Sequence, residues 1–98
     1  MWPLKTKIEI ATEIANRCRD LRLEQNLSQE ELAKRSGIAL RTYRRFEQEG
    51  SISLERLIGV IQSLNRISEL ETILRPSPFE DLDQIENPKA ARKRSRSR

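Results

Sequence analysis

The sequence predicts an all-α fold of five short helices. Four serine or threonine residues stand at positions typical of helix N-caps. Between them, apolar residues recur at the three- and four-residue spacing of a helix face. The chain also holds only three glycines among its 98 residues. Together these features favour a small helical body with a modest hydrophobic core.

The composition sets the size and the charge of this body. A chain of 98 residues corresponds to one domain with its ends. Only 36% of the residues are hydrophobic, and a single core of this size is marginal alone, so we expect a homodimer. The net charge of +4 and the pI of about 9.7 are compatible with an anionic partner.

Cysteine and histidine usage excludes several classes of function. The chain has one cysteine, Cys18, and no histidine, so neither a disulfide framework nor a Cys/His zinc site is available. The sequence also lacks a Ser/His/Asp set and a phosphate-binding glycine loop. We therefore expect no enzymatic activity, no metal and no cofactor, and we interpret Cys18 as a core residue.

The same sequence predicts a soluble, cytoplasmic protein. No apolar stretch approaches the length of a membrane span. The first ten residues lack the apolar region of a signal peptide. The absence of cysteine pairs is compatible with the reducing cytosol.

Each of the first two helices begins with a predicted capping box. The segment TKIE at residues 6–9 starts the first helix, which we expect to end near Gln25. The segment SQEE at residues 28–31 starts the second helix, which we expect to end near Ser36. The apolar positions of the first helix are Ile10, Ala11, Ile14, Cys18 and Leu21.

A tight turn at Gly37 leads into the third helix, which covers about residues 40–48 with Ala39 near its N-cap. Tyr43 and Phe46 have the spacing of core residues. The outward positions are Arg41, Thr42, Arg44 and Arg45. A cationic helix held at a set angle by its neighbours suits a DNA major groove. A solvated charged face is equally compatible with these arginines alone.

Ser53 is expected to cap the fourth helix, and SELE at residues 68–71 to form a capping box for a short fifth helix that ends near Arg75. The apolar positions of the fourth helix are Leu54, Leu57, Ile58, Ile61 and Leu64. Five helices in this order complete the predicted body.

Prolines at positions 76 and 78 divide the chain into a helical domain, residues 1–75, and a C-terminal segment, residues 76–98. Residues 79–87 hold four acidic and no basic residues, and residues 89–98 hold six basic and no acidic ones. We expect this segment to be disordered when free, or ordered by a partner. Non-specific phosphate binding, docking on a partner protein and simple solubilisation all remain open.

The stretch LRLEQNLSQEELAKRSGIALRTYRRFEQEGSISLERLIGVIQSL resembles the Cro/cI-type (XRE) helix-turn-helix domain of five helices. The resemblance covers residues 6–75 and rests on spacing, capping and the turn glycine. It implies a lambda-repressor-like fold that binds double-stranded DNA, in the cytoplasm and associated with the nucleoid. Two departures are Ser36, where an apolar residue is common, and Leu40, where the family often has a polar base-reading residue.

Two arginines are the strongest candidates for reading bases. Arg41 and Arg45 stand at i and i+4 on the third helix, and an arginine fork matches the O6 and N7 atoms of guanine. Ala39 and Leu40 stand at the helix end that reaches base edges in this motif. Leu40 is suited to contact a thymine methyl group.

Other residues are candidates for the DNA backbone and for orienting the third helix. The candidates for phosphate contacts are Ser28, Gln29, Thr42 and Arg44. The start of the second helix suits a phosphate because of its backbone N–H groups and helix dipole. The resemblance implies that Gln29 clamps the DNA backbone. It also implies a partly buried structural ion pair between Arg22 and Glu47.

The C-terminal pattern, ILRPSPFEDLDQ followed by KAARKRSRSR, is similar to short HipB-type antitoxins. This similarity implies a repressor of its own operon that binds a palindromic operator and a HipA-like kinase toxin. The alternative is a stand-alone phage or chromosomal regulator with no toxin partner. The candidates for dimer or partner contacts are Leu70, Ile73, Leu74 and Phe79.

Overall fold

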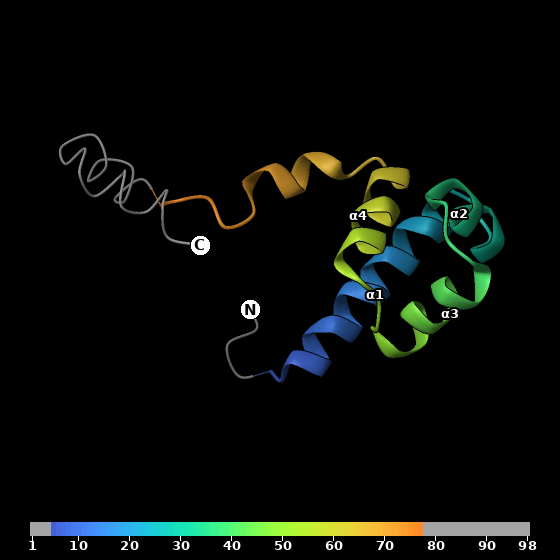
Figure 1. Ribbon diagram of the computed structural model, residues 1–98, viewed down its shortest axis with the longest axis horizontal. Helices are drawn as coiled ribbons and strands as arrows, with labels where there is room; N and C mark the ends of the chain where they lie inside the picture. Colours follow the sequence, from blue (N-terminus) through green and yellow to red (C-terminus); the bar gives the residue numbers. More distant parts are fainter. Residues whose placement is uncertain (1–4, 78–98) are drawn as a thin grey trace.

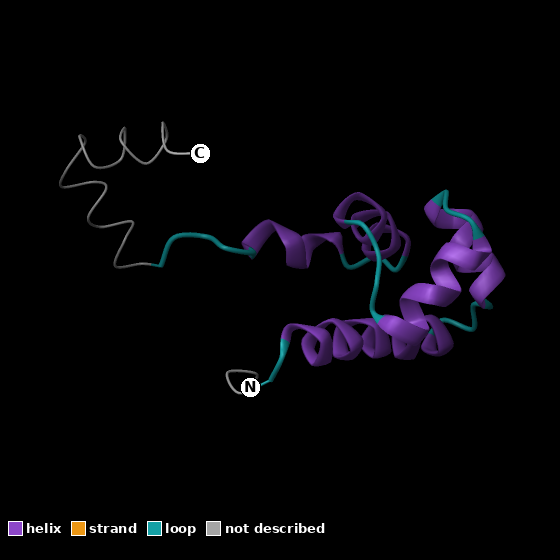
Figure 2. Cartoon of the chain, turned by 60° about the horizontal axis from the view of Figure 1, so that its bottom comes forward, coloured by secondary structure: helices purple, strands orange, loops and turns teal. Residues whose placement is uncertain are grey.

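The computed structural model describes residues 5–77. Over this range every regular element is a helix, and the range contains no strand. Its elements are α1 (Lys7–Glu24), α2 (Gln29–Ser36), α3 (Leu40–Glu49), α4 (Leu54–Ser63) and the 3₁₀ helix η1 (Ile67–Thr72). The four α-helices pack into one body, and η1 leads away from it (Figure 1; Figure 2). The predicted all-α fold is confirmed.

Local side-chain caps start three of the helices as predicted. Thr6 and Ser28 each accept a hydrogen bond from the backbone N–H of a glutamate three residues on, and each glutamate accepts one in return. These backbone hydrogen bonds lower the pKa of Glu9 and of Glu31. Ser53 caps α4 through the N–H of Arg56. Each cap satisfies a backbone donor that the helix itself leaves unpaired.

Two glycines end helices α2 and α3. Gly37 ends α2 with φ of 70°, and Gly50 ends α3 with φ of 74°, both in the left-handed region that other residues avoid. A Cβ on Gly50 would lie 2.8 Å from the carbonyl carbon of Ala11 in α1, whereas Gly37 has open space. Gly50 therefore also allows α3 to end directly against α1.

The core lies where α1 packs against α3 and α2 packs against α4. Tyr43 and Phe46 are fully buried on α3, with their rings edge-to-face at 6.0 Å between centroids. The buried hydrophobic residues are Ala15, Cys18, Leu27, Leu32, Ala33, Tyr43, Phe46, Val60 and Leu64. Burial raises the pKa of Cys18 to about 11, so its thiol stays protonated, as a core residue requires.

A polar contact stands at the crossing of α2 and α4. The hydroxyls of Ser36 and Ser63 lie 3.2 Å apart in a hydrogen bond. Gly59 of α4 lets the backbones approach, because a Cβ there would lie 3.3 Å from the Ser36 carbonyl oxygen. Ser36, which stands where the resemblance implied an apolar residue, therefore finds a hydrogen-bond partner in α4.

The buried face of α4 is narrower than its apolar face. Of the apolar positions named from the sequence, Leu54 is 72% exposed and Ile58 is 38% exposed. Val60 is fully buried instead, together with Leu64. Leu54 stands at the first position of α4, where none of the described elements covers it. The helical spacing placed it on the right face but gave no information about where that face ends.

The predicted capping box at residues 68–71 is wrong. The element there is the 3₁₀ helix η1, which begins after Arg66 and ends at Thr72, before the expected end near Arg75. Asn65, with φ of 63°, turns the chain out of α4, and the Arg66 carbonyl accepts the first bond from the N–H of Glu69. Ser68 consequently lies inside the element, where it does not act as the cap.

Candidate nucleic-acid interface

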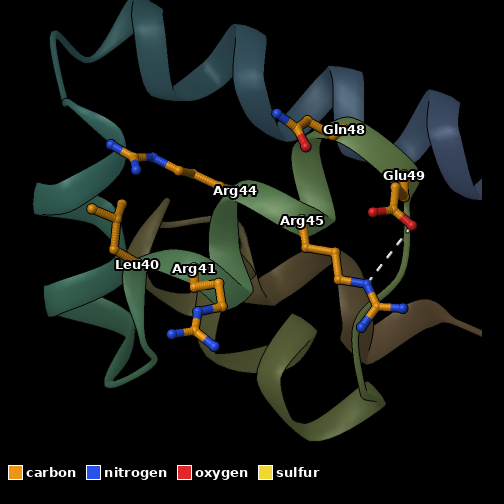
Figure 3. A pocket seen from close by; sticks show the side chains of 6 residues that line it. All are labelled: Leu40, Arg41, Arg44, Arg45, Gln48 and Glu49. Carbon is orange, nitrogen blue, oxygen red and sulfur yellow. Dashed lines mark ion pairs between the residues drawn. The ribbon is translucent and has the colours of Figure 1, made fainter.

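One face of α3 is cationic and exposed. Tyr43 and Phe46 anchor the opposite face in the core, and the side chains of Arg41, Arg44 and Arg45 extend outward (Figure 3). These side chains, with Leu40, Gln48 and Glu49, line a shallow hollow of about 620 Å³. The outward arginines expected from the helical period are therefore brought together on one surface.

Arg41 and Arg45 are available to a ligand. Arg45 lies 3.7 Å from Glu49, and both side chains are more than half exposed. An exposed pair at this distance contributes little to stability, so an anionic ligand can replace it. Within residues 5–77, the Arg41 side chain has neither a hydrogen-bond nor an ion-pair partner. Neither arginine turns inward.

A buried ion pair fixes α3 to α1. The Nε atom of Arg22 donates to Glu47 at 2.8 Å, and its Nη2 atom donates to the other carboxylate oxygen at 3.3 Å. Both side chains are less than one-tenth exposed. The Nη1 atom of Arg22 also donates to the Leu27 carbonyl at 2.8 Å, in the turn before α2. One guanidinium therefore holds α1, the turn and α3 together.

Glu47 is ionised at the centre of this group. Burial acts to raise its pKa, but hydrogen bonds from Arg22, Tyr43 and Gln29 outweigh burial and lower the pKa. The hydrogen bond to Glu47 raises the pKa of Arg22. Burial, and then the hydrogen bond to Glu47, raise the pKa of Tyr43, so its hydroxyl remains a donor to the carboxylate.

Gln29 connects this buried group to the surface. Its Nε2 atom donates to Glu47 at 2.8 Å, and its Oε1 atom accepts from the Nε atom of Arg44 at 3.3 Å. Sequence reasoning placed Gln29 and Arg44 separately at phosphates and missed both contacts. Only the packing of α2 against α3 brings these residues together, so spacing along the chain offered no signal.

The remaining candidates lie around the start of α2 and α3. Ser28 is exposed and serves as the N-cap of α2. Ala39 is the N-cap residue of α3 and is exposed, but it has no side-chain cap. Leu40 and Thr42 are half-buried. The predicted site residues thus fall on one continuous region, from the first turn of α2 across the outer face of α3.

A second, smaller hollow borders this region and was not foreseen. It has a volume of about 240 Å³ and lies between α3 and the start of α4. Arg56 contributes to it from α4, and Arg41 and Arg45 contribute from α3. The helical spacing of α4 identified its apolar residues and gave no indication that Arg56 would lie beside the arginines of α3.

The candidates for dimer contacts are largely exposed. Ile73 and Leu74 are 62% and 95% exposed, respectively, and Leu70 is half-buried in η1. Phe79 lies outside the described residues. Within the described range, no cluster of three or more His, Cys, Asp or Glu residues has the geometry of a metal site. None of the helices in that range combines the length and hydropathy needed to cross a bilayer.

The comparisons with known proteins agree with this geometry. A helix-turn-helix family model matches residues 19–71, which is more than half of the chain and includes all of α2, α3 and α4. No curated protein sequence matches the chain. In helix-turn-helix domains the second helix of the motif lies in the DNA major groove, and α3 is the second helix of the motif formed with α2. The chain belongs to the XRE-type helix-turn-helix family and is a DNA-binding transcription regulator.

Proposed function

We propose that this protein is a sequence-specific repressor that binds a palindromic operator as a homodimer. The observation that carries the proposal is the exposed arginine face of α3, held in place from behind by the buried Arg22–Glu47 pair. A rigid helix presents its side chains to base edges at a defined angle, which sequence recognition requires. Repression follows from occupation of a promoter and needs no chemistry.

The outer face of α3 enters the major groove in this proposal. Arg41 and Arg45 read guanines through their forked donors, and Leu40 contacts a thymine methyl group near Ala39. Phosphate contacts come from Thr42 and from the first turn of α2, at Ser28 and Gln29, where helix N–H groups lack acceptors within the helix. Arg44 contributes a cation beside Gln29, to which it is hydrogen-bonded.

The homodimer is supported by the exposed apolar residues around η1. Ile73 and Leu74 expose large apolar side chains beside the half-buried Leu70. Covering them in a second copy would remove apolar area from water. A two-fold dimer would place the two α3 helices about 34–36 Å apart on successive major grooves.

A second candidate is the antitoxin of a HipA-like kinase toxin operon. Its support is the Pro/acidic/basic order of residues 76–98, a segment that a DNA-binding fold does not require. Co-purification with the product of the neighbouring gene tests this candidate. If that gene encodes no kinase-like toxin, the stand-alone regulator remains.

The test of DNA recognition starts from duplexes selected from a random library with the wild-type protein. Fluorescence anisotropy then compares wild type with the Arg41→Ala/Arg45→Ala variant on the selected and scrambled duplexes. We expect the variant to lose discrimination by about 1–3 kcal/mol for each base pair read. Equal discrimination by both proteins would remove α3 from the base-reading site. A wild-type affinity independent of salt would overturn DNA binding itself.

A further inference from the structure

The buried carboxylate of Glu47 is surrounded by hydrogen-bond donors. Among residues 5–77 it accepts four hydrogen bonds, two on each oxygen. Its Oε1 atom accepts from Nη2 of Arg22 at 3.3 Å and from Nε2 of Gln29 at 2.8 Å. Its Oε2 atom accepts from Nε of Arg22 at 2.8 Å and from the hydroxyl of Tyr43. An ionised carboxylate has about four acceptor sites, so any rotation of this group breaks hydrogen bonds.

The hydroxyl of Tyr43 is the donor that core packing does not explain. The ring is fully buried and lies edge-to-face with Phe46, and a phenylalanine would fill the same space. A hydroxyl buried without a partner costs free energy. The bond to Glu47 removes that cost and fills an acceptor site on Oε2. Beyond its ring, the tyrosine therefore contributes a hold on one side of a buried carboxylate.

The direction of the Gln29 amide depends on this carboxylate. An ionised carboxylate only accepts hydrogen bonds, so Gln29 turns its NH₂ group toward Glu47 and its oxygen toward the surface. That oxygen accepts from the Nε atom of Arg44 at 3.3 Å. The bond holds the exposed arginine beside the first turn of α2 through Nε alone, and the terminal NH₂ groups of the guanidinium take no part in it. Figure 3 shows Arg44 extending away from Arg45.

We propose that Tyr43 is a positioning residue for DNA recognition. Its buried hydroxyl holds the Glu47 carboxylate in the rotation that binds Gln29, and Gln29 in turn holds the Arg44 guanidinium. The inference rests on the proposed DNA binding. It gives a role in recognition to a residue that is fully buried and so touches no DNA.

The loss of the hydroxyl would reach the surface through the Gln29 amide. Without it, Oε2 keeps an empty acceptor site, although the Glu47 side chain is only 5% exposed. A buried acceptor without a donor is costly. The Arg22 guanidinium is held in place by its bond to the Leu27 carbonyl at 2.8 Å. The amide of Gln29 is the donor that is free to shift inward, and this shift takes its oxygen away from Arg44.

The experiment removes one hydroxyl at a time. Tyr43→Phe removes the hydroxyl and keeps the ring. The matched control is Ser36→Ala, which removes a partly buried hydroxyl bonded to Ser63 at 3.2 Å, where α2 crosses α4. Each substitution is made in the wild-type chain and in Gln29→Ala, which gives two double-mutant cycles. Anisotropy measures the affinity for the selected and scrambled duplexes at one low salt concentration, and urea unfolding measures the stability.

We expect Tyr43→Phe to lose roughly three- to tenfold in affinity for both duplexes in the wild-type chain. In the Gln29→Ala chain it should cause no further loss, because the path to Arg44 is already broken. Ser36→Ala should lower the urea midpoint and leave the affinity unchanged in both chains. A merely structural hydroxyl would lower the urea midpoint without this dependence on Gln29.

Three results would overturn the positioning role while leaving DNA binding in place. The first is a wild-type affinity for Tyr43→Phe. The second is an equal loss of affinity in the Gln29→Ala chain, which would show that the effect does not pass through Gln29. The third is an equal loss in Ser36→Ala, which would make the effect a general loosening of the fold. If wild type itself binds neither duplex, the proposed function fails, and the positioning role fails with it.

Discussion

The side-chain amide of Gln29 bridges a buried carboxylate and a surface arginine. It donates to Glu47 at 2.8 Å and accepts from Arg44 at 3.3 Å. Glu47 is itself paired with Arg22, so the first residue of α2 is connected to α1 through α3. The residue that the proposed function places at a phosphate is thereby held by the same group that orients α3.

Gln29→Ala should weaken binding to all DNA sequences alike. The substitution removes the side chain that positions Arg44 beside the proposed phosphate contact, without touching the base-reading face. We expect the affinity for selected and scrambled duplexes to fall by the same factor, with a salt slope close to that of wild type because glutamine carries no charge. Anisotropy titrations over a range of salt measure both quantities. A loss restricted to the selected duplex would contradict the backbone role.

Arg22→Met should destabilise the domain by about 3–5 kcal/mol. It leaves the carboxylate of Glu47 buried without its cation and the Leu27 carbonyl without its donor. Urea unfolding followed by circular dichroism measures the loss. The double variant Arg22→Met/Glu47→Leu should recover much of the stability, because the unpaired charge is gone. A single variant as stable as wild type would show that the pair has no orienting role.

Glu47 should contribute an acid-sensitive part of the stability. Its pKa is lowered in the folded protein, so its ionised form stabilises the fold. That contribution is complete above the ordinary glutamate pKa of about 4.3 and is lost as the pH falls through the lower native value. The stability difference between wild type and Glu47→Gln should therefore be largest near neutral pH and shrink in acid. Glu9 and Glu31 titrate in both proteins, so the difference isolates Glu47. A constant difference would contradict the assignment.

The two helix-ending glycines should respond differently to alanine. Gly37→Ala meets only the cost of a left-handed residue, about 1–2 kcal/mol, because nothing lies near its Cβ. Gly50→Ala meets the same cost and also places a Cβ 2.8 Å from the α1 backbone. We expect Gly50→Ala to be clearly the more destabilising in urea unfolding. Equal losses would mean that α1 and α3 separate easily.

The helix starts were predictable because capping acts over three residues of chain. Thr6, Ser28 and Ser53 each bond to a backbone N–H close by in sequence, so no distant element is needed. The same rule failed at Ser68, because the chain leaves α4 at Asn65 in the left-handed region and the 3₁₀ helix begins at Ile67, two residues before the start that Ser68 would cap. A capping residue therefore fails to start a helix where the preceding turn makes an earlier backbone carbonyl the first hydrogen-bond acceptor of that helix.

The order of helices, the turn at Gly37 and the outward direction of the α3 arginines followed from sequence, since helical period and capping are short-range properties. The contacts that Gln29 makes with Glu47 and Arg44 could not be predicted from the sequence. Nor could the sequence predict that Arg56 lines the same hollow as Arg41 and Arg45. These groups come from helices whose relative placement depends on how the buried faces pack. Side chains separated by many residues share a site only after that packing has brought their helices together.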